Sequence, residues 1–282
     1  MLPSWLDVVA DPILEATKAP AVGELHGELL RQWGSSEVWR LSFGLNSVIV
    51  KRGTDGQADE AAAYERYVVP LDLPAPELIH RHRSGDAGVL VLADVGRVTL
   101  EQEPTAEGFA AGAELLATIR GRPVTGPSEF PPERVGEMAA RIGRIEFGLR
   151  PLTDALAAVH RDAPTAVVHG DFVPKNLVTD GTRWTAIDWP GAYQAPHLSD
   201  LYTLVRDAVA LGHDRAPIVA QYTEAAGGNP AVVERQMLVG GGCFYLVALM
   251  FIVEEGLRTI PESVHWIDGL LTELRDLVGS LA

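Results

Sequence analysis

The stretch VVHGDFVPKNLVTDGTRWTAIDWPG, residues 167–191, places Asp171, Asn176 and Asp188 among short apolar runs. The runs are typical of two short buried strands, with the three oxygen-bearing side chains at their ends. A single Asp or Asn in such a turn is most often a turn former. Three of them at these distances instead favour a functional site, in which flanking strands hold the reactive groups rigid.

The spacing of these residues matches what phosphoryl transfer from a nucleotide requires. That reaction needs a group that orients the attacking hydroxyl, ligands for magnesium, and a cation over the phosphates. Magnesium takes oxygen ligands and keeps several waters, so one carboxylate and one amide can hold it. Four residues separate Asp171 from Asn176, as in the kinase loop H-R-D-x-x-x-x-N, and Asp188 follows a second apolar run, as the aspartate of D-F-G does.

The segments HGDFVPKN, residues 169–176, and AIDWPGAYQAPHLSDL, residues 186–201, resemble the signature of the aminoglycoside phosphotransferase family, the small-molecule branch of the kinase-like fold. The resemblance is strongest over residues 154–202. It implies an α+β, two-lobed, protein-kinase-like fold. A small β-rich nucleotide-binding lobe is expected over residues 1–95, and a larger, mainly helical catalytic and substrate-binding lobe over residues 96–282.

The periodicity of the chain agrees with this plan. Three short apolar runs between about Glu28 and Arg52 predict an antiparallel meander, and the alanine-rich segment 55–69 predicts a helix. Two further strands are expected at residues 76–82 and 88–96, and the two lobes should join near residues 93–96. Beyond Gly96 the segments have helix length, apart from the two strands of the opening stretch.

The resemblance also implies a role for each matched residue. Asp171 is the expected catalytic aspartate, and Asn176 and Asp188 are the expected magnesium ligands. Lys51 should contact the phosphates of ATP or GTP, and Glu60 should pair with that lysine in preference to Glu65.

Two further segments are expected to contact the nucleotide. Gly34, Ser35 and Ser36 stand where the phosphate-covering loop belongs, and Leu92, Ala93 and Asp94 where the lobe connection holds the base through its backbone.

The sequence departs from the family pattern at two points. The loop after the first strand has a single glycine, so G-x-G-x-x-G is absent. Val173 replaces a histidine or lysine common two residues after the catalytic aspartate, and we hypothesise that Lys175 supplies that charge. His169 and Asp200 are expected to brace the loop and not to take part in the chemistry.

Composition limits the partners of the chain. The 282 residues carry a formal net charge of −15, which disfavours binding to nucleic acid or to an anionic membrane and favours a cationic substrate. Cys243 is the only cysteine, so a cytoplasmic protein is expected. The N-terminus does not read as a secretory signal. The apolar segment Leu238–Val253 contains three glycines and is shorter than a membrane span, which predicts a buried core helix.

The acceptor is expected to be a small molecule with a hydroxyl group. Gly170 stands where protein kinases have the arginine of H-R-D, and only eleven residues separate Asp188 from Asp200, which leaves little room for a peptide platform. The charge favours aminoglycosides or basic peptide antibiotics, and hence antibiotic resistance. The candidate carboxylates that would bind such a cation follow the motif: Asp207, Glu254, Glu255, Glu262 and Asp268.

Three alternatives stay open at this point. The chain could be a metabolic kinase for choline, homoserine or an amino sugar, because fold does not determine the substrate. It could be a nucleotide-binding module without activity, although the groups for the chemistry are all present in the sequence. A two-carboxylate metal hydrolase would need further His and carboxylate ligands, which are not clustered near the motif.

Overall fold

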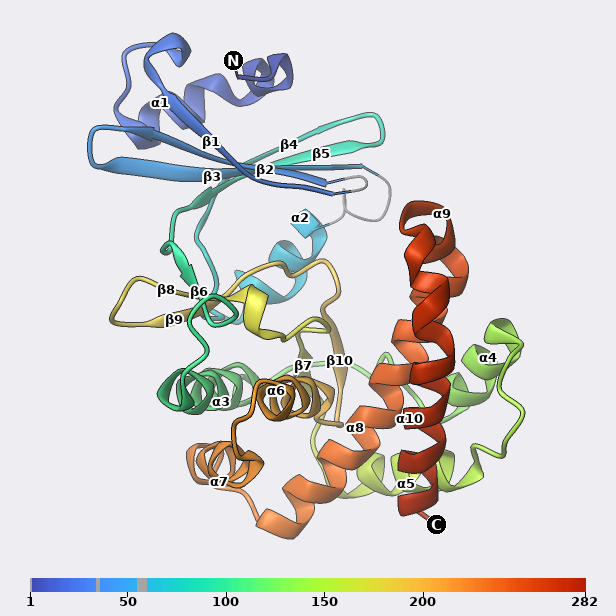
Figure 1. Ribbon diagram of the computed structural model, residues 1–282. Coiled ribbons are helices and arrows are strands. Elements are labelled where there is room, and N and C mark those ends of the chain that lie inside the picture. The colour runs from blue at the N-terminus through green and yellow to red at the C-terminus, as the bar shows by residue number, and fades with distance from the viewer. Residues whose placement is uncertain (1, 34–35, 55–59) are drawn as a thin grey trace. The chain divides into compact units, whose positions relative to one another are not determined.

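The computed structural model describes residues 2–33, 36–54 and 60–282, and the chain divides into two compact units (Figure 1). The first unit contains Met1–Val98 and Val178–Gly191, and the second contains Thr99–Leu177 and Ala192–Ala282. The segment 178–191, which carries Asp188, therefore belongs with the N-terminal part of the chain and not with the sequence that precedes it.

The first unit is built on a five-stranded antiparallel sheet in the order β1-β2-β3-β5-β4. The expected meander is its first three strands. The turn at Gly44, which has a φ of 60°, joins β2 to β3, a conformation that glycine adopts without strain. The strands are β1 (His26–Trp33), β2 (Ser36–Phe43), β3 (Asn46–Thr54), β4 (Leu78–Ser84) and β5 (Ala87–Ala93).

The two faces of this sheet differ in chemistry. One face buries Leu41, Val50 and Val91 against the N-terminal helices, from which Leu6 and Ile13 enter the same core. Those helices, which the sequence patterns did not predict, are η1 (Ser4–Val9), α1 (Ala10–Thr17) and η2 (Val22–Glu24). Because side chains alternate along a strand, the opposite face carries the neighbouring residues, Lys51 among them.

The remaining elements of the first unit are short. The predicted helix begins, within the described residues, at Glu60 as α2 (Glu60–Ala63) and continues as a π-helical turn, η4 (Tyr64–Val68). The short strand β6 (Val98–Thr99) follows β5. The returning segment forms the neighbouring strands β8 (Leu177–Thr179) and β9 (Trp184–Ala186), and the Ala186 N–H donates to the Pro74 carbonyl at 3.3 Å.

The second unit is mainly helical, as expected. A two-stranded antiparallel sheet, β7 (Ala166–Val168) with β10 (Tyr193–Ala195), lies among the helices. The helices are α3 (Ala106–Arg120), α4 (Glu133–Ile142), α5 (Arg150–Asp162), η5 (Pro174–Asn176), α6 (Ser199–Ala210), α7 (Arg215–Ala225), α8 (Pro230–Phe251), η6 (Ile252–Gly256), α9 (Leu257–Thr259), η7 (Pro261–Trp266) and α10 (Ile267–Ser280).

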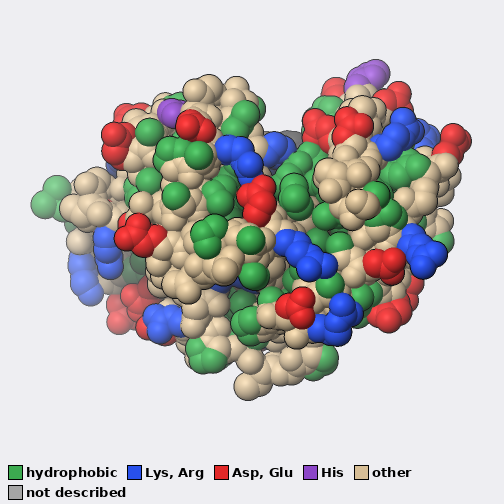
Figure 2. All heavy atoms as spheres, turned by 90° about the horizontal axis from the view of Figure 1, so that it is seen from below, with side chains coloured by type: hydrophobic (Ala, Val, Ile, Leu, Met, Phe, Trp, Pro, Cys, Tyr) green, Lys and Arg blue, Asp and Glu red, His purple; other side chains and the backbone are tan. Residues whose placement is uncertain are grey.

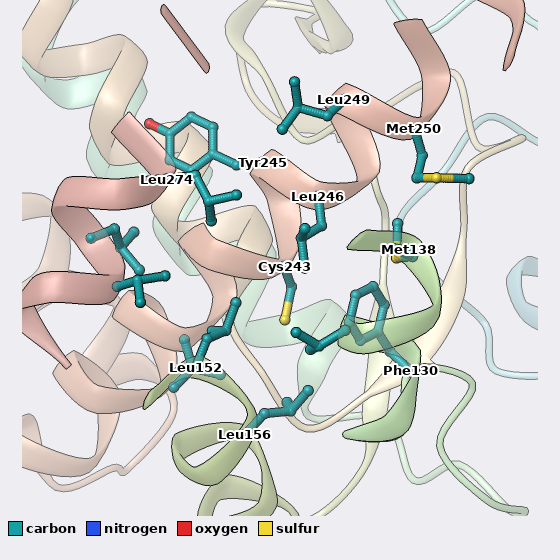
Figure 3. Packing of buried hydrophobic residues seen from close by; sticks show 14 of the residues in the cluster. Phe130, Met138, Leu152, Leu156, Cys243, Tyr245, Leu246, Leu249, Met250 and Leu274 are labelled. Carbon is teal, nitrogen blue, oxygen red and sulfur yellow. The ribbon is translucent and has the colours of Figure 1, made fainter. Parts of the chain in front are cut away.

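The core of this unit forms around α8, as Figure 3 shows. Cys243 and Leu246 of α8 are completely buried and belong to one cluster with Leu156 of α5, Phe130 and Leu274 of α10. By length and composition the helical stretch Pro230–Thr259 could cross a membrane, but 61% of its most apolar window is buried inside the protein. It is the core helix that the sequence predicts.

Three consecutive glycines allow α8 to approach α5 and α6 closely. A Cβ on Gly240 would lie 2.3 Å from the backbone nitrogen of Ser199, one on Gly241 would meet the Tyr202 ring, and one on Gly242 would meet Leu152. Glycine costs about 1 kcal/mol relative to alanine within a helix. The three glycines weaken α8 itself, and they are explained by the close packing of α8 on α5 and on the start of α6.

Candidate active site

The first unit holds Lys51 between two carboxylates. Lys51 Nζ lies 2.6 Å from Glu60 Oε2 and also contacts Asp188 Oδ1. Glu65 does not compete for this lysine, because it pairs with Arg81 on the surface. The pairing of Lys51 with Glu60 that the sequence suggested is thus present in the structure.

Burial and charge act in opposite directions on Lys51. Its burial disfavours the charged form, but the two carboxylates outweigh that effect and raise the pKa of Lys51 above its ordinary value. The lysine is therefore a fixed positive charge at any physiological pH. Such a group can hold the phosphates of a nucleotide.

The backbone around Asp188 is held in an uncommon conformation. Asp188 has a φ of 70°, which is in the left-handed region that few residues other than glycine adopt. The next N–H, that of Trp189, donates to Glu60 Oε1 at 3.2 Å, and the Trp189 side chain is fully buried. These contacts fix the direction in which the Asp188 carboxylate points.

The second unit holds the Asp171 carboxylate in place while leaving it accessible. Asn176 Nδ2 donates to Asp171 Oδ2 at 2.8 Å and to the Asp171 carbonyl at 2.9 Å, and Lys175 Nζ lies 3.3 Å from Oδ2. The Asp171 side chain is 43% exposed. A fixed, exposed carboxylate can accept a hydrogen bond from a substrate hydroxyl. Lys175 lies beside it, as its place in the loop suggests.

Asp200 braces the loop that carries Asp171. Its carboxylate accepts from the backbone N–H groups of His169, at 2.7 Å, and Gly170, at 3.1 Å. Burial raises the pKa of Asp200 despite these bonds. His169 contributes from the other side, because its Nδ1 accepts from the Asp171 N–H at 3.3 Å. Asp200 has the loop-bracing contacts expected of it, and His169 contacts the backbone of the same loop.

Asn176 and Asp188 each offer a side-chain oxygen of the kind that magnesium takes. Because Asn176 uses its amide nitrogen to hold Asp171, its side-chain oxygen is the atom that remains to act as a ligand. Asp188 adds a carboxylate, and both are the hard oxygen ligands that magnesium takes. In the part of the chain that the structure describes, no three His, Cys, Asp or Glu residues cluster as metal ligands.

The family model described as the phosphotransferase enzyme family matches residues 28–235 of this sequence, which include all of the groups above. The chain belongs to this family. No curated protein matches the sequence.

Solved structures share the kinase-like fold of this phosphotransferase. A thermostable mutant of aminoglycoside phosphotransferase APH(4)-Ia, in a ternary complex with AMP-PNP and hygromycin B, is 17% identical, with 96% of this chain and 98% of that chain covered and a TM-score of 0.65. Choline kinase LicA from Streptococcus pneumoniae is 16% identical, with 97% and 100% covered and a TM-score of 0.65. A putative fructosamine-3-kinase from Haemophilus somnus 129PT is 13% identical, with 97% and 96% covered and a TM-score of 0.65.

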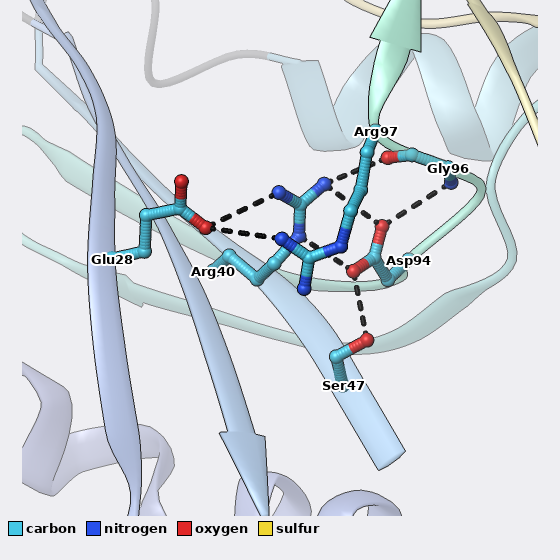
Figure 4. Close-up of polar contacts among 6 residues, drawn as sticks. All are labelled: Glu28, Arg40, Ser47, Asp94, Gly96 and Arg97. Carbon is cyan, nitrogen blue, oxygen red and sulfur yellow. Dashed lines mark hydrogen bonds and ion pairs between the residues drawn. The ribbon is translucent and has the colours of Figure 1, made fainter. Parts of the chain in front are cut away.

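The end of β5 is locked by an ionic network that sequence reasoning missed (Figure 4). Asp94 accepts from Arg40 Nε at 2.7 Å, from Ser47 Oγ at 2.8 Å and from the Gly96 N–H at 3.3 Å, while Arg40 Nη2 donates to the Gly96 carbonyl at 2.7 Å. Burial opposes the ionisation of Asp94, but the bonds from Arg40 and Ser47 lower the pKa of Asp94. The carboxylate of Asp94 thus holds the connecting segment in shape.

Two of the residues predicted to contact the nucleotide lie outside the described residues, and the others lie in or at the end of strands. Gly34 and Ser35 are not among the described residues, whereas Ser36 begins β2 and is buried. Leu92 is buried within β5, and Ala93 ends that strand with its N–H donating to the Glu77 carbonyl. The backbone contacts with a base that were expected of this segment stay a prediction.

The five candidate acceptor carboxylates do not form one cluster of free groups. Asp207 pairs with Arg206 at 2.6 Å, and Glu254 pairs with Arg141. Glu262 and Asp268 are exposed on η7 and α10, and Glu255 is partly buried on η6. Their role in binding a substrate stays a prediction.

Proposed function

We propose that this phosphotransferase moves the γ-phosphoryl group of ATP or GTP to a hydroxyl of a small cationic molecule. The single observation that carries the proposal is the Asp171 carboxylate, fixed by Asn176 at 2.8 Å and exposed to solvent. Complexes of similar structures with AMP-PNP and with ADP support a nucleotide donor.

Each residue has a defined task in the proposed reaction. Asp171 accepts a hydrogen bond from the acceptor hydroxyl and so directs its oxygen toward the phosphorus. Lys51, held by Glu60, binds the donor phosphates. Asn176 and Asp188 would hold magnesium, which supplies positive charge that neutralises the transferred group. Lys175 places a positive charge 3.3 Å from Asp171 Oδ2.

A cationic acceptor is supported by the charge of the chain. The formal net charge is −15. On the face seen in Figure 2, acidic side chains are interspersed with basic ones, so the excess negative charge is not gathered on that face. Net charge favours the approach of a cation, and the identity of the acceptor needs a separate experiment.

Aminoglycosides and basic peptide antibiotics are the first acceptors we propose, with antibiotic resistance as the biological outcome and the cytoplasm as the site of action. A metabolic acceptor such as choline, homoserine or an amino sugar is the second candidate. It is supported by the choline kinase, which matches with the same TM-score as the aminoglycoside phosphotransferase.

The test is nucleotide consumption with magnesium across a panel of these acceptors, using ATP and GTP separately, followed by mass spectrometry of the product. We expect one acceptor to gain a single phosphoryl group. Asp171→Asn should retain nucleotide binding and lose turnover by orders of magnitude. Unchanged turnover in Asp171→Asn would refute the proposed mechanism. Nucleotide binding without transfer to any acceptor would favour a silent binding module.

A further inference from the structure

Arg31 of β1 lies on the same face of the sheet as Lys51. In the strand register, Arg31 stands opposite Val38 of β2, and Val38 stands opposite Lys51 of β3. Residues directly opposite each other in neighbouring strands point to the same face. Arg31 and Lys51 therefore form one row across three strands, with a valine between them.

A bulge in β1 produces this alignment. Leu29 pairs with Trp39 and Arg31 with Val38, so Leu30 is an extra residue in the strand. Without the bulge, Leu30 would stand opposite Val38 and Arg31 would point to the other face, because a shift of one residue reverses every side chain. The backbone irregularity thus places a cation beside Lys51 where the simple alternation would place a leucine.

Lys51 and Arg31 lie near different oxygens of the Asp188 carboxylate. Lys51 contacts Oδ1, while Arg31 Nη1 lies 3.8 Å from Oδ2. The Arg31 side chain is 40% exposed, and 3.8 Å is longer than a hydrogen bond. An ion pair of this kind contributes little to stability. Giving up this one ion pair therefore costs little.

A nucleoside triphosphate that binds with magnesium would favour the exchange of Asp188 for phosphate at Arg31 in two ways. Asp188 would use its oxygens to hold the magnesium, and the phosphates would offer the guanidinium paired oxygen acceptors that suit its planar shape. Arg31 also offers a contact that the loop after β1 lacks in sequence, because this loop has one glycine in place of G-x-G-x-x-G.

We propose that Arg31 is a second phosphate-binding cation of this enzyme, paired with Asp188 in the nucleotide-free chain and with the donor phosphates when nucleotide binds. The proposal deepens the proposed function and rests on its nucleoside triphosphate donor. It adds a residue to the site that no matched motif contains.

The test measures nucleotide binding by calorimetry and does not depend on phosphoryl transfer. ATP (or GTP, if that is the donor) and the corresponding nucleoside are titrated into the wild-type chain, once with magnesium and once with a chelator. For Arg31→Met we expect triphosphate affinity to fall about tenfold or more, in both conditions, with nucleoside affinity unchanged. Arg31→Lys should restore part of the loss, because it keeps the charge and loses the planar fork.

Two variants make the result specific. Arg52→Met removes the same charge from the opposite face of the sheet, where Arg52 lies over the Trp5 ring, and it should bind triphosphate as the wild type does. Lys51→Met should lose triphosphate affinity. Thermal unfolding of each variant shows whether it is folded.

The outcomes separate this inference from the proposed function. If Arg31→Met binds triphosphate as well as the wild type while Lys51→Met does not, Arg31 has no phosphate role and the proposed function stands. Equal losses for triphosphate and nucleoside would also overturn the inference, because they would place the effect at the base or in folding. A folded wild-type chain that binds neither ATP nor GTP would overturn both this inference and the proposed function.

Discussion

Replacing Gly240 by alanine should weaken folding and catalysis together, because α8 touches the backbone that precedes Asp200. The added Cβ would lie 2.3 Å from the Ser199 nitrogen, whereas ordinary contact begins at 3.4 Å, so one backbone must move by about 1.1 Å (3.4 − 2.3). Alanine stabilises the helix by about 1 kcal/mol relative to glycine. Overpacking against a backbone that cannot rotate away costs about 3 kcal/mol. The net destabilisation is about 2 kcal/mol.

The same movement should reach the active site. Ser199 is followed by Asp200, whose carboxylate holds the N–H groups of His169 and Gly170 next to Asp171. A displacement of about 1 Å in a catalytic loop can lower kcat by up to about a hundredfold. We therefore expect Gly240→Ala to lose a large part of kcat even under conditions in which the protein stays folded.

Urea unfolding and steady-state kinetics on the same preparations measure both effects. Gly136→Ala is the matched control, because Gly136 lies within α4 and a Cβ there would meet nothing within 4 Å. This control should be stabilised by up to about 1 kcal/mol with kcat unchanged. If Gly240→Ala behaves like Gly136→Ala in both assays, the close approach of α8 to the start of α6 does not have the role we assign to it.

Three further changes have defined outcomes. Asp94→Asn leaves the buried Arg40 guanidinium without its closest carboxylate and should destabilise the chain by about 3 kcal/mol in urea titrations. Arg40→Met/Asp94→Asn should lose less than the sum of the losses of Asp94→Asn and Arg40→Met, and a loss equal to that sum would show that the pair is not coupled. His197 is fully buried, and burial lowers the pKa of His197 to about 3 from 6.5, so only the unfolded state gains its proton as pH falls from 6.5 toward 3. The contribution of neutral His197 to the free energy of unfolding is therefore complete above pH 6.5 and falls by about 1.4 kcal/mol per pH unit below it. His197→Phe lacks this pH dependence, so its free energy of unfolding should fall less steeply with decreasing pH than that of the wild type. Asp200→Asn replaces one accepting oxygen with a donor that faces an N–H, and should lower kcat at least tenfold with little change in nucleotide affinity; a normal kcat would remove Asp200 as the brace.

Local sequence signals were sufficient for the motif residues and for most strands. Asp171, Asn176 and Asp188 are identifiable because the roles we propose for them require fixed residue types at fixed spacing. The meander expected over residues 28–52 appears as β1 to β3, since its apolar runs and turn signals are local. The helix expected over residues 55–69 changes to a π-helical turn at Tyr64, which the alanine-rich composition does not indicate.

The residues that the sequence did not reveal depend on register and on contacts between distant segments. Arg31 faces Asp188 only because of the bulge after Leu29, and a bulge cannot be read from alternation alone. Arg40 and Asp94 are 54 positions apart, and nothing local marks them as partners. Arg40 lies on the face of Val38 by simple alternation within β2, whereas Arg31 joins that face only through the bulge, so the strand register is needed to place both.

The return of residues 178–191 to the first unit affects how the protein can be made in the cell. The ribosome completes residues 1–98 early, but this unit lacks β9 and Asp188 until residue 191 has emerged. At about 5–20 residues per second, the intervening 93 residues (191 − 98) delay its completion by roughly 5–20 seconds. During that interval Glu60 and Lys51 lack the partners that Trp189 and Asp188 provide. A fragment ending at residue 98 would lack these partners permanently, so a separately expressed first unit needs the 178–191 segment supplied through a linker.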